Sequence, residues 1–288
     1  MDRRFAVDRF ARLRASILRS LPRPIADAIL PTWNRAKWRL AERRADVLLV
    51  SYPKAGRTWL ATLLGHAFAA HFGIEGDSEE LTSLNDADRR VPRFHRTHDG
   101  VMPGALPSEI RRDKARYRGR TVILLVRDPR DILVSQYHHL RHRTRVLDSD
   151  LEAFAAQERS GFGTILAFHR AWLDALDVPA RTLVVRYEDL AATPSAELDR
   201  VLRFLGIVAS AETLERAVAA SSFAAMRRRE SSGDATNAAR RTSDPDNPDA
   251  YKARRGEVGG YLDALAPSTI ARLDARLRDA GLARFGYG

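Results

Sequence analysis

Residues 46–59 read Asp-Val-Leu-Leu-Val-Ser-Tyr-Pro-Lys-Ala-Gly-Arg-Thr-Trp, and this stretch decides the fold. The apolar run Val47–Val50 has the length of a buried strand, and residues 58–71 follow a helical pattern. Between them, Gly56 lets backbone N–H groups approach an anion at the start of the helix. Lys54 adds a positive charge. The stretch therefore predicts a strand, a phosphate-binding loop and a helix.

The same order of strand, loop and helix recurs twice along the chain. Residues 121–126 lead through a polar loop into a helix from about 131 to 141, and residues 182–187 lead to a helix after Pro194. Continuous apolar strands that each lead to a helix indicate a central parallel sheet flanked by helices. We therefore expect a three-layer α/β fold in which the three loops lie together at the carboxyl ends of the strands.

Composition narrows the class of protein. The chain has 288 residues, of which 44% are hydrophobic, and it has no cysteine. A chain of this size can bury a large core, and the lack of cysteine excludes disulfides, cysteine-ligated zinc and thiol nucleophiles. No apolar run approaches the roughly 18 residues of a spanning helix, and the N-terminus lacks the apolar core of a secretory signal. These features predict a cytoplasmic protein.

The positive charge is concentrated near the N-terminus. Residues 1–44 hold 12 basic and 4 acidic residues, a net charge of +8 out of +11 for the chain. We expect residues 1–44 to form a basic amphipathic helical extension, which is either a solvated arginine-rich helix or a contact site for anionic lipid at the inner membrane surface. The main domain is expected over residues 45–288, with a polar, mobile, lid-like segment at about 227–262.

Three motifs resemble those of one enzyme family. Residues 52–59 resemble the 5′-phosphosulfate loop of the sulfotransferases that use 3′-phosphoadenosine 5′-phosphosulfate (PAPS), in a bacterial-like member with cytosolic-type motifs. Residues 127–137 resemble the family's 3′-phosphate motif, and residues 92–98 resemble its Lys-Thr-His segment. Together with matches around residues 187, 221–223 and 254–256, these motifs follow the family's order and span roughly residues 46–280. The resemblance implies a single-domain, P-loop-like fold and a PAPS-dependent sulfotransferase.

The resemblance also implies roles for individual residues. His98 would be the general base for the acceptor hydroxyl, Lys54 would stabilise the leaving phosphate, and Arg96 would assist at the sulfuryl group. Asp99 is the alternative base. The residues implied to bind PAPS, or its product 3′,5′-bisphosphate (PAP), are Lys54, Ala55, Gly56, Arg57, Thr58, Trp59, Arg127, Ser135, Tyr187, Ser221, Phe223, Arg254, Arg255 and Gly256. No metal is expected.

The chain departs from the family pattern at several positions. Arg57 stands where the family often has serine or threonine, and Arg96 replaces a lysine beside the base. The Gly-Asp-Trp end of the last motif is Gly-Gly-Tyr in residues 259–261, and residues 213–218 show no recognisable dimer motif. The acceptor is expected to be a hydroxyl of a small molecule, a glycan or a lipid. Its identity and the oligomeric state stay open.

Other clusters and functions have competing interpretations. The histidines at 138, 139 and 142 lack a carboxylate partner nearby in the sequence, so they indicate a polar helix face rather than a metal site. Phe168 and Trp172 have the spacing of core residues. A P-loop kinase shares the predicted layout but needs a Gly-Lys-Ser/Thr sequence that the loop lacks. A basic module for nucleic acid or membrane surfaces is the other alternative, although no nucleic-acid partner is expected.

Overall fold

Two strands that the sequence predicts form the centre of the sheet. β1 (Val47–Ser51) is buried along its whole length, and β3 (Thr121–Val126) is buried in all but its first residue. β2 (Phe94–Thr97) pairs with β1, and β4 (Arg181–Arg186) pairs with β3. The four strands are parallel, in the order β2-β1-β3-β4. The predicted α/β fold with a central parallel sheet is confirmed.

The computed structural model describes residues 36, 38–75, 78, 80–232, 247, 249, 251 and 256–288. The chain divides into two units, residues 1–45 and 46–288. Residues 36 and 38–44 of the first unit are helical, and the amphipathic helix predicted upstream of them lies outside the described residues. None of the helices in the described ranges combines the length and the apolar character needed to cross a membrane.

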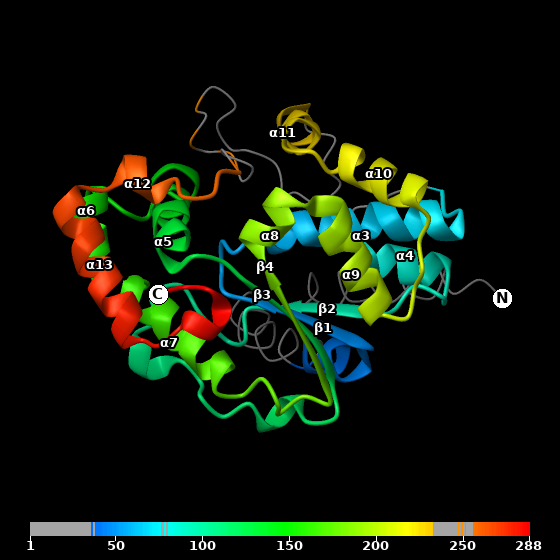
Figure 1. Ribbon diagram of the computed structural model, residues 1–288, viewed down its shortest axis with the longest axis horizontal. Helices are drawn as coiled ribbons and strands as arrows, with labels where there is room; N and C mark the ends of the chain where they lie inside the picture. The colour runs from blue at the N-terminus through cyan, green and yellow to red at the C-terminus, as the bar shows by residue number, and fades with distance from the viewer. Residues whose placement is uncertain are drawn as a thin grey trace, which may run out of the picture. The chain divides into compact units, whose positions relative to one another are not determined.

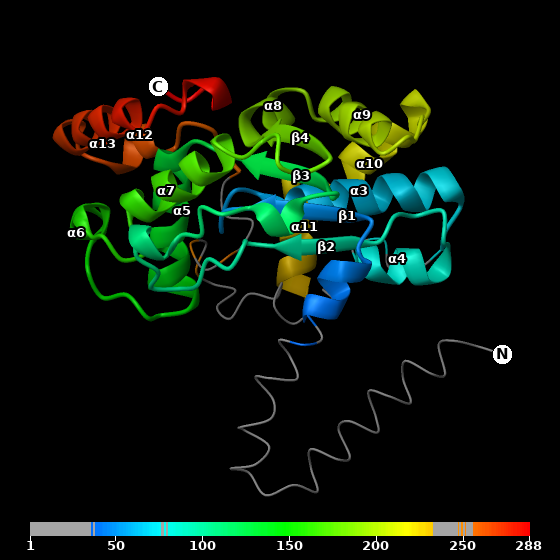
Figure 2. The same cartoon turned by 90° about the horizontal axis from the view of Figure 1, so that it is seen from below.

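The helices of the larger unit form two groups on either side of the strands' carboxyl ends. α3 packs against α9 and α10, and α5 packs against α6, α7 and α12 (Figures 1 and 2). The arrowheads of β2 and β3 point toward the group that contains α5 and α7 (Figure 2). The helices are α3 (Arg57–Phe72), α4 (Leu81–Ala87), α5 (Pro129–His138), α6 (Leu151–Ala156), α7 (Phe162–Leu173), α8 (Tyr187–Ala192), α9 (Pro194–Phe204), α10 (Ala211–Ala220), α11 (Phe223–Ser232), α12 (Tyr261–Ala264) and α13 (Pro267–Asp279).

Several short elements complete the unit. The π-helical turn η3 extends α5 without a break. η3 spans His139–Arg143. The other short turns are 3₁₀ helices, namely η1 (Pro107–Glu109), η2 (Ala115–Tyr117) and η6 (Ala283–Phe285).

The structure differs from the sequence-based expectation at two places. The segment at 227–262, predicted as a polar mobile stretch, begins inside α11 and ends inside α12, and most of the residues between these helices lie outside the described ranges. The predicted strand 182–187 was followed by a loop up to Pro194, whereas Tyr187–Ala192 form α8. α8 begins at the residue after β4, so the chain turns directly from strand to helix there.

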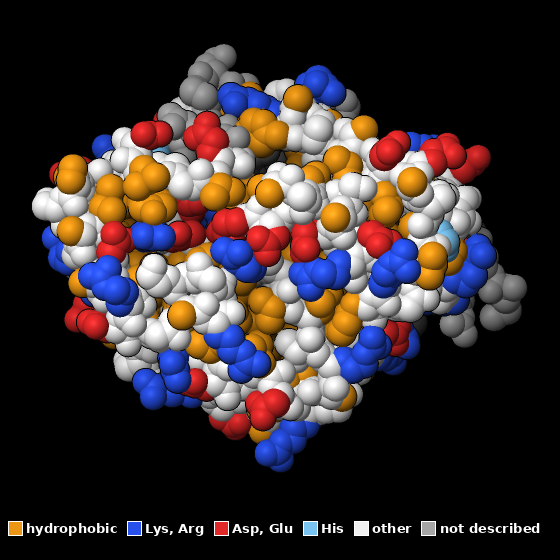
Figure 3. All heavy atoms as spheres, viewed as in Figure 1, with side chains coloured by type: hydrophobic (Ala, Val, Ile, Leu, Met, Phe, Trp, Pro, Cys, Tyr) orange, Lys and Arg blue, Asp and Glu red, His pale blue; other side chains and the backbone are white. Residues whose placement is uncertain are grey.

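The predicted core residues are buried, and charge is mixed on the surface. Phe168 and Trp172 of α7 are almost completely inaccessible to solvent, which confirms their place in the core. On the face drawn in Figure 3, basic and acidic side chains alternate over short distances. This mixture agrees with the net charge of only +3 on residues 45–288.

Candidate active site

The phosphate-binding loop between β1 and α3 has the backbone conformation that an anion site requires. Lys54 has φ 71° and Gly56 has φ 96°, both in the left-handed region. Gly56 is the N-cap of α3, and no side chain caps the helix. The positive end of the helix dipole and the N–H groups of the first turn can therefore be satisfied by an anion.

Aromatic side chains pack directly against this loop. A Cβ on Gly56 would lie 2.5 Å from Cδ2 of Tyr187, so the ring closes on the space that the glycine leaves. The Tyr187 hydroxyl donates to the carbonyl of Gly256 at 3.1 Å. Trp59 meets Tyr187 edge to face and donates from Nε1 to the carbonyl of Ser221 at 3.1 Å. Residues that are far apart in the sequence thus meet beside the loop.

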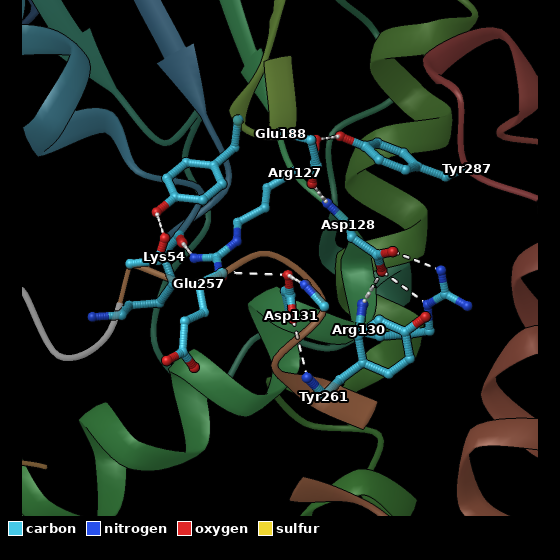
Figure 4. Close-up of polar contacts among 12 residues, drawn as sticks. Lys54, Arg127, Asp128, Arg130, Asp131, Glu188, Glu257, Tyr261 and Tyr287 are labelled. Carbon is cyan, nitrogen blue, oxygen red and sulfur yellow. Dashed lines mark hydrogen bonds and ion pairs between the residues drawn. The ribbon is translucent and has the colours of Figure 1, made fainter. Parts of the chain in front are cut away.

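Arg127 connects the end of β3 to the loop and to the C-terminal segment. Its Nη2 donates to the carbonyl of Glu257 at 2.8 Å and forms an ion pair with Asp131 at 3.5 Å (Figure 4). The guanidinium lies over the ring of Tyr187, 4.1 Å from its centroid. Its Nε is buried and has no hydrogen-bond partner among the described residues. The guanidinium of Arg127 is therefore held in place, and its Nε–H can still donate a hydrogen bond to a further acceptor.

Asp131 fixes the backbone that Arg127 contacts. The carboxylate of Asp131, on α5, accepts hydrogen bonds from the backbone N–H groups of Gly259 and Tyr261 at 2.9 and 3.2 Å (Figure 4). Only 2% of the Asp131 side chain is exposed, so these bonds are shielded from water. The C-terminal segment is thereby tied to the helix that also carries Ser135.

His98 directly follows β2 and is held from both sides. Its Nδ1 lies 2.9 Å from the carbonyl oxygen of Ser51, and its Nε2 lies 2.9 Å from Nη2 of Arg57. A carbonyl can only accept and a guanidinium can only donate, so Nδ1 carries the hydrogen and Nε2 has the lone pair. This is the tautomer of an imidazole that can take up a proton at Nε2.

Asp99, the alternative base, belongs to a buried network instead. Its carboxylate accepts from Lys114 at 2.6 Å, from Arg116 and Tyr117 at 2.8 Å, and from Nε1 of Trp172 at 3.1 Å. Burial lowers the pKa of Lys114, which the adjacent Asp99 opposes. Only 1% of the Asp99 side chain is exposed. The carboxylate therefore has a structural role and does not face the cavity.

The predicted site residues surround one cavity of about 760 Å³. Its lining includes eleven of them, namely Lys54, Gly56, Arg57, Thr58, Trp59, His98, Arg127, Ser135, Tyr187, Phe223 and Gly256. Ala55 and Ser221 are buried behind the lining, and Arg96 forms an ion pair with Glu80 at 3.1 Å. Arg254 and Arg255 lie outside the described residues.

The rest of the cavity wall combines apolar and polar side chains. The apolar ones include Val101, Met102, Pro103, Val134, Leu140, Val146 and Met226, and the polar ones include Gln136, His139, Thr144, Ser160, Arg229 and Glu230. The apolar ones come from the segment that follows His98, from α5, from η3 and the loop after it, and from α11. No periodic pattern connects these segments, so the sequence did not indicate their individual side chains.

The comparisons with known proteins agree with this geometry. Residues 44–285 match the family described as the sulfotransferase domain. The chain belongs to the sulfotransferase family. The match covers most of the larger unit, from the residues before the N-terminal end of β1 to the last turn. The predicted sulfotransferase class is thereby confirmed.

Relatives and solved structures of this sulfotransferase are distant. Cytosolic sulfotransferase 14 of Arabidopsis thaliana is 25% identical over 81% of this chain and 74% of its own. Sulfotransferase 1A1 of the dog, Canis lupus familiaris, is 28% identical over 63% of this chain and 66% of its own.

Two solved structures share the fold. A mouse sulfotransferase, SULT7A1, complexed with PAP has a TM-score of 0.55 and 20% identity over 81% of this chain and 84% of its own. A retinol dehydratase in complex with androsterone and PAP has a TM-score of 0.54 and 19% identity over 82% of this chain and 80% of its own. These likenesses confirm the P-loop-like fold.

A histidine cluster at the end of α5 differs from the sequence-based interpretation. Asp249 supplies the carboxylate that the sequence did not place there, and its Oδ1 lies 3.4 Å from Nδ1 of His138. One ligand atom each from His138, His142 and Asp249 lies within 4.8 Å of the others. The rings of His138 and His142 are stacked at 5.6 Å.

Proposed function

We propose that this sulfotransferase transfers a sulfuryl group from PAPS to the hydroxyl of an acceptor with an apolar body. The observation that carries the proposal is the meeting of three groups in one cavity: the uncapped start of α3, the guanidinium of Arg127 and the lone pair of His98. The first two suit a doubly phosphorylated nucleotide, and the third suits a hydroxyl proton.

The residues of the cavity fit the donor. Gly56 leaves room that any Cβ would fill, and the buried Nε of Arg127 has a hydrogen-bond donor to spare in the described part of the chain. Trp59 and Tyr187 supply aromatic surface beside the loop. The PAP held by the mouse and retinol dehydratase structures supports the same donor here.

Each group has a chemical role in the proposed reaction. When bound, PAPS supplies a sulfuryl group that bonds to the acceptor oxygen as its bond to the 5′-phosphate breaks, which gives PAP and a sulfate ester. Lys54 and the N-terminus of α3 stabilise the negative charge that gathers on the leaving phosphate. His98 takes the proton of the acceptor hydroxyl at Nε2, while its Nδ1 hydrogen bond to Ser51 keeps the ring oriented. Arg96 is proposed to assist at the sulfuryl group.

The apolar wall supports a narrower choice of acceptor. Val101, Met102, Leu140 and Val146 offer apolar surface, and burying the apolar body of an acceptor against it is favourable, whereas a bare sugar has little apolar surface to bury there. We therefore propose a hydroxylated aromatic or aliphatic compound rather than a glycan. The androsterone in the retinol dehydratase structure is a compound of this kind.

The cellular setting is part of the same proposal. The plant relatives are named cytosolic, which supports the predicted cytoplasmic location. The predicted contact of residues 1–44 with an anionic membrane rests largely on residues that the structure does not describe. It stays a prediction.

Calorimetry with PAP tests the donor site. We expect the parent protein to bind PAP and to bind ATP and ADP more weakly. Lys54→Ala and Arg127→Ala should each weaken PAP at least about tenfold, because a lost hydrogen bond to a charged group costs that much or more. Arg90→Ala, at an exposed ion pair with Asp88, is the matched control. A folded parent that does not bind PAP, or that prefers ATP, would refute the donor assignment.

Turnover tests the base and the acceptor class. His98→Asn should leave the affinity for PAP nearly unchanged and lower kcat by about 10²–10⁴, the usual contribution of a general base. The assay is sulfate transfer from PAPS to a panel of phenols, sterols and hexoses. An active His98→Asn variant would remove the proposed base, and transfer to hexoses alone would overturn the apolar acceptor.

A further inference from the structure

Arg57 is hydrogen-bonded to Nε2 of His98, the nitrogen that takes up the proton in the proposed reaction. The guanidinium Nη2 lies 2.9 Å from Nε2 of His98, and the opposite ring nitrogen is held by Ser51. The lone pair on Nε2 is therefore already used as a hydrogen-bond acceptor. An acceptor hydroxyl can reach this lone pair only after the guanidinium has moved.

Arg57 is a half-buried cation whose hydrogen-bonding groups are incompletely satisfied. Its Nη1 is buried without a hydrogen-bond partner among the described residues. Burial, with a smaller contribution from repulsion by Arg96, lowers the pKa of Arg57 to about 10. Glu80 binds Arg96 through both of its oxygens at 3.1 Å. A buried charge of this kind is stabilised when an anion binds beside it.

The cavity at the start of α3 offers a place for an anion beside Arg57. Arg57 is the first residue of α3, and Lys54, Gly56, Arg57 and His98 line the same cavity. A phosphosulfate held at the start of α3 would bring its sulfonate to the side of the loop where Arg57 and His98 meet. A sulfonate has three oxygens that accept hydrogen bonds, so it competes well for a guanidinium.

We propose, given the donor assignment above, that Arg57 is a positioning residue that holds Nε2 of His98 until PAPS binds and then turns to the sulfonate. The base thus becomes available only when the group to be transferred is in place. Before that, the guanidinium excludes other hydroxyls, including water, from Nε2. The discriminating ligand is the sulfonate, because PAP has the same phosphates and lacks it.

The first test compares two donors in two proteins. Calorimetry without acceptor measures the dissociation constants of PAP and PAPS in the parent and in Arg57→Ser. We expect Arg57→Ser to weaken PAPS at least about tenfold and PAP by less than about threefold, because only PAPS presents the oxygens that Arg57 binds. Arg57→Lys keeps the charge without the planar fork and should retain part of the preference for PAPS.

Two outcomes of this comparison would overturn the inference. Equal weakening of PAP and PAPS would make Arg57 an ordinary phosphate ligand, and no weakening of either would leave it without contact to the donor. Arg90→Ser removes an exposed guanidinium by the same substitution and is the control. Thermal unfolding of all variants verifies that they are folded.

The second test needs no donor and examines His98 directly. Diethyl pyrocarbonate acylates an imidazole nitrogen that has a lone pair, and peptide mass spectrometry measures the modified fraction at His98. In the ligand-free protein we expect Arg57→Ser to react at His98 at least about tenfold faster than the parent. Equal rates would show that Arg57 does not cover Nε2. Absence of PAP binding by the parent would instead defeat the donor assignment and leave this measurement interpretable.

Discussion

At the scale of single residues, Gly56 meets two separate requirements. Its φ of 96° belongs to the left-handed region that a residue with a side chain enters at a cost, and a Cβ there would overlap the ring of Tyr187. Gly206 meets only the first requirement, since its φ is 81° and no atom lies within 4 Å of the position that a Cβ would take. The two glycines therefore separate backbone strain from steric overlap.

Gly56→Ala should damage both stability and the donor site. We expect the free energy of unfolding to fall by about 2–4 kcal/mol, from left-handed strain of about 1 kcal/mol and overpacking of about 1–3 kcal/mol. Gly206→Ala should lose only about 1 kcal/mol. Denaturant unfolding measures both, and PAP binding should weaken in Gly56→Ala alone. Equal losses in the two variants would mean that Tyr187 moves aside freely.

Single residues also mark how far the sequence could predict the site. The order of strand, glycine loop and helix was sufficient to place Lys54 and Gly56 at an anion site, because this geometry is local. The contact between Arg57 and His98 joins positions 41 residues apart. It depends on the pairing of β1 with β2, which sets the ends of both strands side by side. Nothing in the residue types of the segment could supply that distance.

At the scale of elements, the sequence predicted β1, β3 and the edge strand β4 and missed the other edge strand, β2. β2 is Phe-His-Arg-Thr, whereas the equally one-sided β4 has the apolar run Leu183–Val185. A four-residue strand with three polar residues shows no apolar run, so its pattern does not indicate a strand. The sequence indicated the buried face of α7 more clearly, because this face includes Phe168 and Trp172. The same face includes a residue whose effect the sequence does not reveal, His169.

His169 should make stability depend on pH. The side chain is buried in α7, and burial lowers its pKa from 6.5 to about 4. Between these values the unfolded chain binds a proton that the folded protein does not, so the free energy of unfolding falls as the pH falls from 6.5 to 4. At pH 7 both states are neutral and the effect is absent. The loss should reach about 3 kcal/mol at the lower end.

Urea unfolding of variants isolates this effect. His169→Leu should remove about one proton of uptake from the pH dependence between 6.5 and 4. The same change at the exposed His71 should leave the slope unaltered. If the parent and His169→Leu have parallel pH profiles, His169 is protonated in the folded state and burial does not lower its pKa.

At the scale of the whole molecule, one unit holds the entire described cavity. Its lining residues run from Tyr52 to Gly260, and all of them belong to residues 46–288. The sequence could predict the donor half of this cavity, because motifs at strand ends converge in a parallel sheet. It could not name the side chains of the acceptor half, because they come from segments without shared periodicity.

Deletion of residues 1–44 tests this division. We expect the shortened protein to bind PAP within about twofold of the parent, as independent parts of a protein contribute additively. Sedimentation with anionic vesicles measures the other predicted role, and membrane binding should fall with the loss of a net charge of +8. Loss of PAP affinity in a folded, shortened protein would show that the N-terminal residues serve the donor site.

The contacts at Gly256 and Glu257 have a consequence for folding during protein synthesis. Tyr187 and Arg127 both donate to backbone carbonyls of this late segment. A chain on the ribosome emerges from its N-terminus, so the sheet and the phosphate loop leave the exit tunnel well before residues 256 and 257. Until then the two side chains lack the acceptors that orient them. We therefore expect the nucleotide site to be completed only in the last stage of translation, after residues 256 and 257 have left the exit tunnel.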